Sequence, residues 1–216
     1  MKKLFAVVIT VFAIFNVQAS DWVNISSEDP APAKITLISS QVSQSSVQFT
    51  LNGFWKNIVE TDNGNAWLLS VEDGAPSIKK GAPDLPIFAG SLIVPDMSNM
   101  KVNIISSEYV EYNNVLIAPS KGNLTRDIDP ATIPFEFGEV YETDAFYPGM
   151  LAVLNDPYIV RDFRGQAIHF QPFQYICFSY VQALKNLILF CTVLQVHIFP
   201  YRDWHTFVHE ALYEYH

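Results

Sequence analysis

The sequence contains few cysteines, few charged residues and no cluster of basic residues, and each absence excludes a class of protein. Two cysteines among 216 residues exclude a disulfide-dense scaffold and a four-cysteine zinc site. Charged residues make up 16% of the chain, and acidic residues outnumber basic ones by 22 to 13. Nucleic-acid binding requires clustered Lys and Arg, so a chain of net charge −9 is not expected to bind it. No glycine loop of the phosphate-binding kind is present, and no repeat of about 20–50 residues indicates a solenoid.

What the chain does contain is enough apolar material for a packed core. Hydrophobic residues make up 50% and aromatic residues 14% of the sequence. That composition predicts a folded protein rather than a disordered one. The length fits one β-domain or two small ones.

The first residues have the order of a secretory signal peptide. Two lysines precede an apolar run at residues 4–17, and small residues follow at Val17 and Ala19. The run of about 14 residues is too short for a membrane span. We therefore expect cleavage between Ala19 and Ser20 and a protein secreted to the periplasm or the extracellular space; a buried first helix is the alternative.

Alternating apolar and polar residues predict strands through the body of the chain. The segments are 34–40, 46–51, 66–69, 91–94, 100–105, 115–118, 158–160 and 167–170. Asp62-Asn63-Gly64-Asn65 precedes one of them and favours a tight hairpin, whereas a calcium loop would need a later glutamate. The 13 prolines interrupt helices. The fold class predicted is all-β, an antiparallel sandwich or barrel-like body.

Composition divides the mature chain into three parts. Residues 20–33 are polar and predict a flexible N-terminus, and residues 34–175 form the strand-rich domain. Residues 176–200 carry one charge, Lys185, and begin an apolar tail that reaches residue 216. The tail has helical spacing in one half and strand-like spacing in the other, and a membrane span is a further alternative.

Residues 119–134 are bounded by prolines and predict a long exposed loop, which favours a functional segment. The loop contains Lys121, Arg126, Asp127 and Asp129.

Candidate chemical groups are sparse. A disulfide between Cys177 and Cys191 would close a loop of about 14 residues. The sequence does not decide whether this bond forms, and two buried free cysteines are the alternative. His205 and His209 with Glu210 have helical spacing for zinc, yet no third ligand is evident. No metal site, cofactor or small-molecule substrate is predicted.

Five segments together resemble the N-terminal propeptide of gingipain-type, Arg-specific secreted cysteine peptidases. They are GAPDLP (81–86), VLIAPSKG (115–122), FYPG (146–149), RDFRGQ (161–166) and PFQY (172–175). The resemblance implies a β-rich domain that keeps a peptidase latent, helps it to fold and is removed by proteolysis. It implies that the partner is the cognate peptidase domain and that the chain itself, without the catalytic His and Cys, is not an enzyme.

The resemblance ends at Tyr175, where the composition changes. We therefore expect a truncated or frameshifted product whose residues 176–216 are foreign to the fold.

The resemblance also implies an inhibitory residue. Arg126 occupies the position at which Arg-specific members present a pseudo-substrate arginine, with Asp127 on its leaving side. Lys121 is the main rival. Arg161 and Arg164 flank a turn, can pair with Asp162 and are expected to be structural.

The alternative function is a secreted all-β binding or adhesion module. Trp55, Trp67, Tyr109 and Tyr112 would stack on sugars in such a module.

Overall fold

The computed structural model describes residues 20–41, 43–96, 98–177 and 180–193. Within these ranges the chain forms twelve strands and two short 3₁₀ helices. They are β1 (Asp21–Asn24), β2 (Lys34–Gln41), β3 (Gln44–Thr50), β4 (Gly53–Thr61), β5 (Gly64–Ser70), β6 (Phe88–Val94), β7 (Met100–Asn113), η1 (Pro130–Thr132), η2 (Glu139–Glu142), β8 (Ala152–Leu154), β9 (Tyr158–Val160), β10 (Phe163–Phe170), β11 (Phe173–Ile176) and β12 (Tyr180–Val193). The prediction of an all-β antiparallel fold is confirmed.

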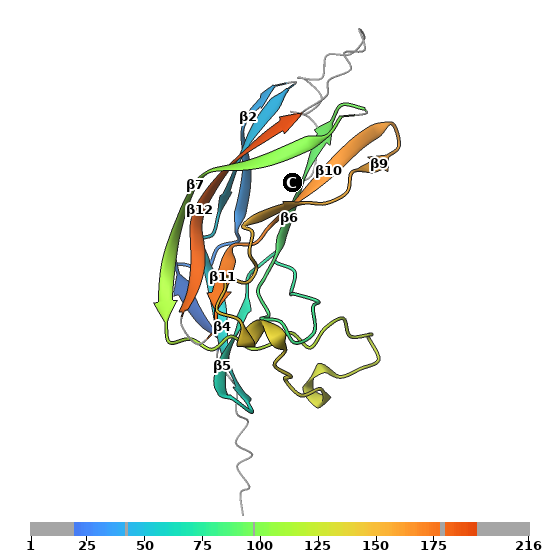
Figure 1. Cartoon of the computed structure of the whole chain (residues 1–216). Coiled ribbons are helices and arrows are strands. Elements are labelled where there is room, and N and C mark those ends of the chain that lie inside the picture. Colours follow the sequence, from blue (N-terminus) through green and yellow to red (C-terminus); the bar gives the residue numbers. More distant parts are fainter. Residues whose placement is uncertain (1–19, 42, 97, 178–179, 194–216) are drawn as a thin grey trace, which may run out of the picture.

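Three antiparallel sheets build the molecule (Figure 1). The largest has the order β11-β12-β3-β2, with β7 on the other side of β12. The second has the order β6-β10-β8, with β9 continuing the edge beside β10. The third, β1-β4-β5, lies at the lower end in Figure 1. The elongated body leaves the segment between β7 and β8 as a large excursion at the lower right.

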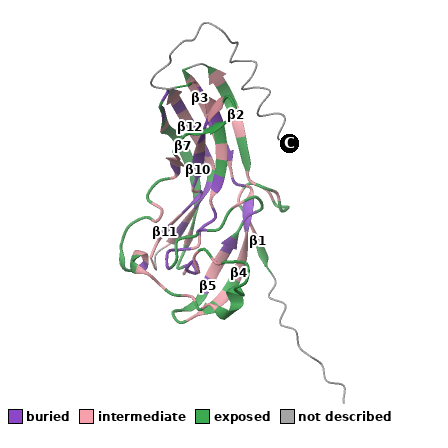
Figure 2. Ribbon diagram, turned by 90° about the vertical axis from the view of Figure 1, so that its right-hand side faces the viewer, coloured by how far each residue is buried: buried purple, intermediate pink, exposed green. Residues whose placement is uncertain are grey.

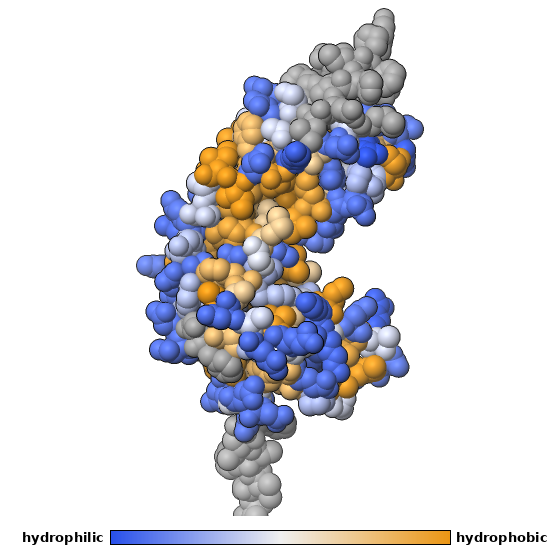
Figure 3. Space-filling model, viewed as in Figure 1, coloured by the Kyte–Doolittle hydropathy of each residue, from blue (hydrophilic) through white to orange (hydrophobic). Residues whose placement is uncertain are grey.

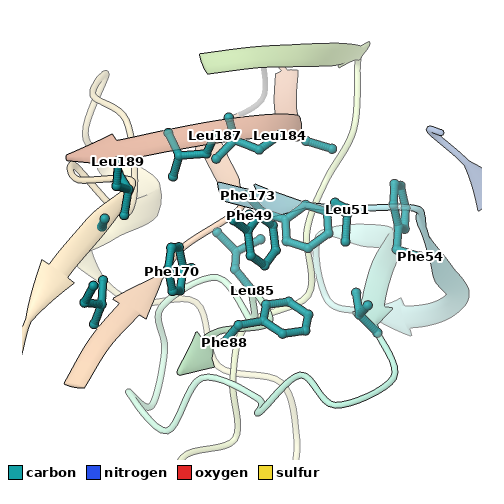
Figure 4. Close-up of a cluster of buried hydrophobic side chains, with 14 of the residues drawn as sticks. Phe49, Leu51, Phe54, Leu85, Phe88, Phe170, Phe173, Leu184, Leu187 and Leu189 are labelled. Carbon is teal, nitrogen blue, oxygen red and sulfur yellow. The ribbon is translucent and has the colours of Figure 1, made fainter. Parts of the chain in front are cut away.

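Aromatic side chains join the sheets into one core. Phe49 of β3 packs on Phe88 of β6 and Phe170 of β10, with ring centroids 5.2 and 5.4 Å apart. Phe54 of β4 meets Phe173 of β11 at 5.4 Å and ties in the third sheet. Figure 4 shows these rings among leucines from β12, and Figure 2 shows buried residues along the facing strands and exposed residues in the loops. The facing apolar surfaces supply the main stabilisation of the fold.

The expected domain end at Tyr175 is wrong, because β12 lies in the middle of the largest sheet. It pairs with β11 and β3 on one side and with β7 on the other. Its side chains Leu187 and Leu189 are fully buried. Residues up to Val193 are therefore part of the fold rather than foreign to it. The rest of the expected tail, 194–216, lies outside the described residues, as do the signal-peptide segment 1–19 and the histidines at 205 and 209.

A β-bulge explains the helical spacing seen in this segment. Lys185 is the extra residue between the pairs Leu184–Tyr109 and Asn186–Glu108. The bulge turns Leu184 inward next to buried Ala183 and leaves Lys185 exposed. Buried residues three apart therefore occur within a strand, where an uninterrupted strand would alternate.

The two cysteines are free and lie near opposite ends of this strand. Cys177 precedes β12, and Cys191 pairs with Val102 near its other end. A strand rises about 3.3 Å per residue, whereas a disulfide needs Cα atoms within about 7 Å. An intramolecular disulfide between them is therefore excluded by the structure.

Three local predictions also need correction. The N-terminus is not loose at β1, which pairs with β4 while Trp22 packs edge-on against Trp55 at 5.3 Å. Residues 115–118 do not form a strand: Leu116 is half-buried, the other three are buried, and Ile117 makes a single bridge to Trp67 on β5. Positive-φ Asn114 and Pro119 bound this short segment. The turn expected between Arg161 and Arg164 is confined to Arg161 and Asp162, since β10 begins at Phe163 and includes Arg164.

Candidate functional site

The segment between β7 and β8 contains a closed loop, residues 119–138, which we call the Arg126 loop. Its predicted exposure is confirmed: residues 125–132 are all exposed. In Figure 3 the surface is hollowed between this loop region, at the lower right, and the sheets above it. The loop therefore projects from the body beside a recess, where another molecule has room to approach.

The base of the loop is held by the backbone of one residue, Gly81. Its N–H donates to the Ser120 carbonyl at 2.9 Å, and its carbonyl accepts the Gly138 N–H at 2.9 Å. Gly81 has φ +78, and a Cβ there would lie 3.3 Å from the Gly138 Cα. Only glycine takes both that conformation and that close backbone approach without strain. Sequence inspection missed this junction, because nothing local indicates that the two glycines meet.

Further contacts fasten both ends of the loop. The Ser120 N–H donates to the Ala82 carbonyl at 2.7 Å, and the Ser120 hydroxyl donates to the Ser77 carbonyl. Lys80 and Glu136 form an exposed ion pair at 2.9 Å. These contacts fix the loop ends, so the residues between them have a restricted range of positions.

A buried tyrosine supports the returning end of the loop. The Tyr141 hydroxyl in η2 donates to the Ile117 carbonyl at 2.9 Å, and its ring meets Phe137 edge-on at 4.7 Å. Burial raises the pKa of Tyr141, which therefore stays neutral and keeps this hydrogen bond at physiological pH.

A β-turn forms the outer part of the loop. The Ile128 N–H donates to the Thr125 carbonyl at 3.1 Å, which places Arg126 and Asp127 at the two central positions. A hydrogen bond from the Thr125 hydroxyl lowers the pKa of the Asp127 carboxyl. Arg126 is exposed, and among the described residues its guanidinium has no ion pair or hydrogen bond. The turn thus holds a free cation outward beside an ionised carboxylate.

Lys121, the rival candidate, is engaged inside the loop. Its ammonium donates to the Pro130 carbonyl at 2.7 Å and lies 4.1 Å from the centre of the Phe135 ring. Arg161 lies in the β9–β10 turn with φ 54, and Arg164 lies on β10. Neither arginine pairs with Asp162 among the described residues, so the expected ion pairs there are not formed.

The aromatic residues proposed for sugar stacking do not form a platform. Tyr112 packs edge-on against Phe54 and Trp67, and Trp55 packs against Trp22. Only Tyr109 of the four is largely exposed, at 51%. The expected binding surface is therefore mostly used for internal packing.

The described residues hold no group of three His, Cys, Asp or Glu side chains placed to bind a metal. No helix among them is long and apolar enough to cross a membrane.

Comparison with known proteins gives consistent matches over most of the chain. The family model described as Propeptide_C25 matches residues 26–199. Gingipain R2 of Porphyromonas gingivalis is 37% identical over 175 residues, which are 81% of this chain and 24% of that protein. Gingipain R1 of the same species is 44% identical over 139 residues, which are 64% of this chain and 14% of that protein. The chain spans about a quarter of the length of gingipain R2.

Two solved structures share the architecture. A complex of the pro- and mature domains of RgpB from Porphyromonas gingivalis matches with a TM-score of 0.72 and 34% identity, covering 81% of this chain and 95% of that one. A structure that addresses the zymogenic latency of gingipain K from the same species matches with a TM-score of 0.68 and 18% identity, covering 82% of this chain and all of that one. At that identity the second match shows the fold alone.

Proposed function

The chain belongs to the family described as Propeptide_C25, and from this premise we propose that it keeps a gingipain-type cysteine peptidase latent and assists its folding. The structural relative with 34% identity is a complex of pro- and mature domains, which supports a peptidase domain as the partner. The family match is to a propeptide, so the described domain is an inhibitor rather than a peptidase.

We further propose that Arg126 is the pseudo-substrate residue. One observation carries this proposal: the loop is tied at its base, and its outer turn presents an arginine that has no hydrogen bond or ion pair with any other described residue. An Arg-specific peptidase needs an acidic, concave pocket for its substrate side chain. A guanidinium held outward can enter such a pocket without breaking contacts within its own domain, whereas the ammonium of Lys121 would have to leave two.

Asp127 is proposed to slow cleavage after Arg126. Its carboxyl is ionised at neutral pH, and the hydrogen bond from Thr125 lowers its pKa further and holds the side chain in the turn. A negative charge directly after the arginine is repelled by acidic residues of the pocket. This repulsion disfavours the position in which the bond after Arg126 would be cut. The arginine is then bound like substrate but cut slowly, and Asp127→Ala should be cut faster.

The signal peptide is proposed to direct the chain out of the cytoplasm. Cleavage is proposed between Ala19 and Ser20, on the small residues at Val17 and Ala19. N-terminal sequencing of exported protein should begin at Ser20, and exported protein that begins at Met1 would contradict the proposal.

The pseudo-substrate role is tested by inhibition constants against an Arg-specific gingipain-type peptidase. Truncating a central, charge-paired anchor costs about 2–4 kcal/mol, so Arg126→Ala should raise the inhibition constant by about 30- to 1,000-fold. Arg161→Ala is the matched control, because Arg161 is also exposed in a turn, and it should leave the constant unchanged. An equal effect of both changes, or none from Arg126→Ala, would refute the role.

A further inference from the structure

Lys121 connects the outgoing half of the Arg126 loop to the returning half. Its Nζ donates to the Pro130 carbonyl at 2.7 Å. The same ammonium lies over the Phe135 ring, 4.1 Å from its centre. The contact to Pro130 encloses residues 122–129, and the turn with Arg126 lies within this enclosed segment.

Both attachment points of this connection are themselves held in place. On the outgoing side, the Gly122 N–H next to Lys121 donates to the Ser120 hydroxyl at 3.1 Å. On the returning side, the Pro130 carbonyl also accepts the Ile133 N–H at 3.3 Å, which closes η1. The Asp129 carboxylate caps η1 by accepting the Ala131 N–H at 2.9 Å. A side chain that joins two fixed points limits how far the segment between them can open.

We propose that Lys121 is a positioning residue, whose ammonium clasps the Arg126 loop in the shape that presents Arg126 to the peptidase. This inference rests on the proposed role of Arg126. Lys121 is then a support for the pseudo-substrate residue rather than its rival. The clasp combines a charge-assisted hydrogen bond with a cation–π contact, and both require the positive charge.

Loss of the charge should weaken inhibition, because the loop would then spend a smaller fraction of the time in the shape that presents Arg126. A free chain that presents Arg126 only part of the time binds with an affinity reduced by that fraction. We expect Lys121→Met, which keeps the aliphatic chain without the ammonium, to raise the inhibition constant by about 5- to 20-fold. Lys121→Arg should have an inhibition constant within about threefold of the wild-type value, because a guanidinium can also donate to a carbonyl and stack on a ring.

The experiment uses the full chain and an Arg-specific gingipain-type peptidase. Lys101→Met is the matched control, since Lys101 is exposed on β7 and makes no ion pair or side-chain hydrogen bond among the described residues. The control should inhibit like the wild type. A second readout is cleavage of the free chain at Leu124 or Ile128 by a peptidase that cuts beside apolar residues. Lys121→Met should be cut several-fold faster in this loop, whereas Lys121→Arg and Lys101→Met should not.

A double-mutant cycle separates this inference from the proposed function. If Lys121 acts through Arg126, Lys121→Met should cost little once Arg126 is alanine. An equal fold-loss in both backgrounds would overturn the positioning role, and so would unchanged loop cleavage or failure of Lys121→Arg to rescue. If Arg126→Ala alone inhibits like the wild type, the proposed pseudo-substrate role of Arg126 fails, and the loop-cleavage rate still decides whether Lys121 closes the loop.

Discussion

Replacing Leu189 by alanine tests whether β12 belongs to the core. Leu189 is fully buried, and its backbone pairs with Val47 of β3 and Ile104 of β7. It points into the cluster that holds Phe49 and Phe170 (Figure 4). At about 0.8 kcal/mol per buried CH₂, the lost transfer free energy is roughly 2–2.5 kcal/mol. The cavity that remains brings the expected loss to about 3–4 kcal/mol.

The assay is urea and thermal unfolding of the full chain, with Lys185→Ala as a control in the same strand. For a domain of this size the melting temperature should fall by about 6–16 °C. Lys185 is exposed at the bulge, so its replacement should change the free energy of unfolding by less than about 0.5 kcal/mol. A Leu189→Ala chain as stable as the control would refute the placement of β12 in the sandwich.

Three further predictions concern other parts of the domain. At Gly81 the backbone has φ +78, and an added Cβ would lie 3.3 Å from the Gly138 Cα. Gly81→Ala should therefore lower the free energy of unfolding by about 1–2 kcal/mol and weaken inhibition. Wild-type values in both urea unfolding and inhibition assays would contradict this. Burial raises the pKa of the Asp84 carboxyl, which accepts the Ser77 N–H. The folded state therefore binds this proton more tightly than the unfolded state, and the contribution to stability is lost as pH rises through the folded pKa. Asp84→Asn should accordingly be more stable than wild type at pH 7 but not at pH 3 in urea titrations, and a less stable variant at pH 7 would be the opposite result. Burial raises the pKa of the Cys191 thiol to about 11, so maleimide should label it slowly until the chain is unfolded; rapid labelling of the native chain would show that it is not buried.

The sequence was sufficient for the fold class and for the position of the long loop. Strands with clean alternation, such as β2 and β3, matched the segments expected at residues 34–40 and 46–51. The sequence misplaces β12, because the bulge at Lys185 breaks the two-residue period and because its half-buried outer face also carries apolar residues, Ile188 and Phe190. A strand that carries apolar residues on both faces does not show the alternation of apolar and polar residues that reveals a half-buried strand.

The arrangement of the site could be foreseen only in part. Arg126 is predicted as the pseudo-substrate residue by resemblance and by its place in a proline-bounded segment, and the turn around it uses local residues. The Gly81–Gly138 junction and the clasp from Lys121 to Phe135 depend on how distant segments return to each other. Such contacts arise from tertiary packing and leave no periodic pattern in the chain.

The most direct test of the central claim is a change of specificity at Arg126. Inhibition constants of the wild type and Arg126→Lys are measured against an Arg-specific and a Lys-specific gingipain-type peptidase. If the side chain occupies the specificity pocket, the lysine variant should lose about 10- to 100-fold against the Arg-specific enzyme, because an ammonium does not reproduce a two-pronged guanidinium contact. It should also gain against the Lys-specific enzyme. Constants that stay the same for both enzymes would contradict the claim and show that the domain blocks the peptidase without Arg126.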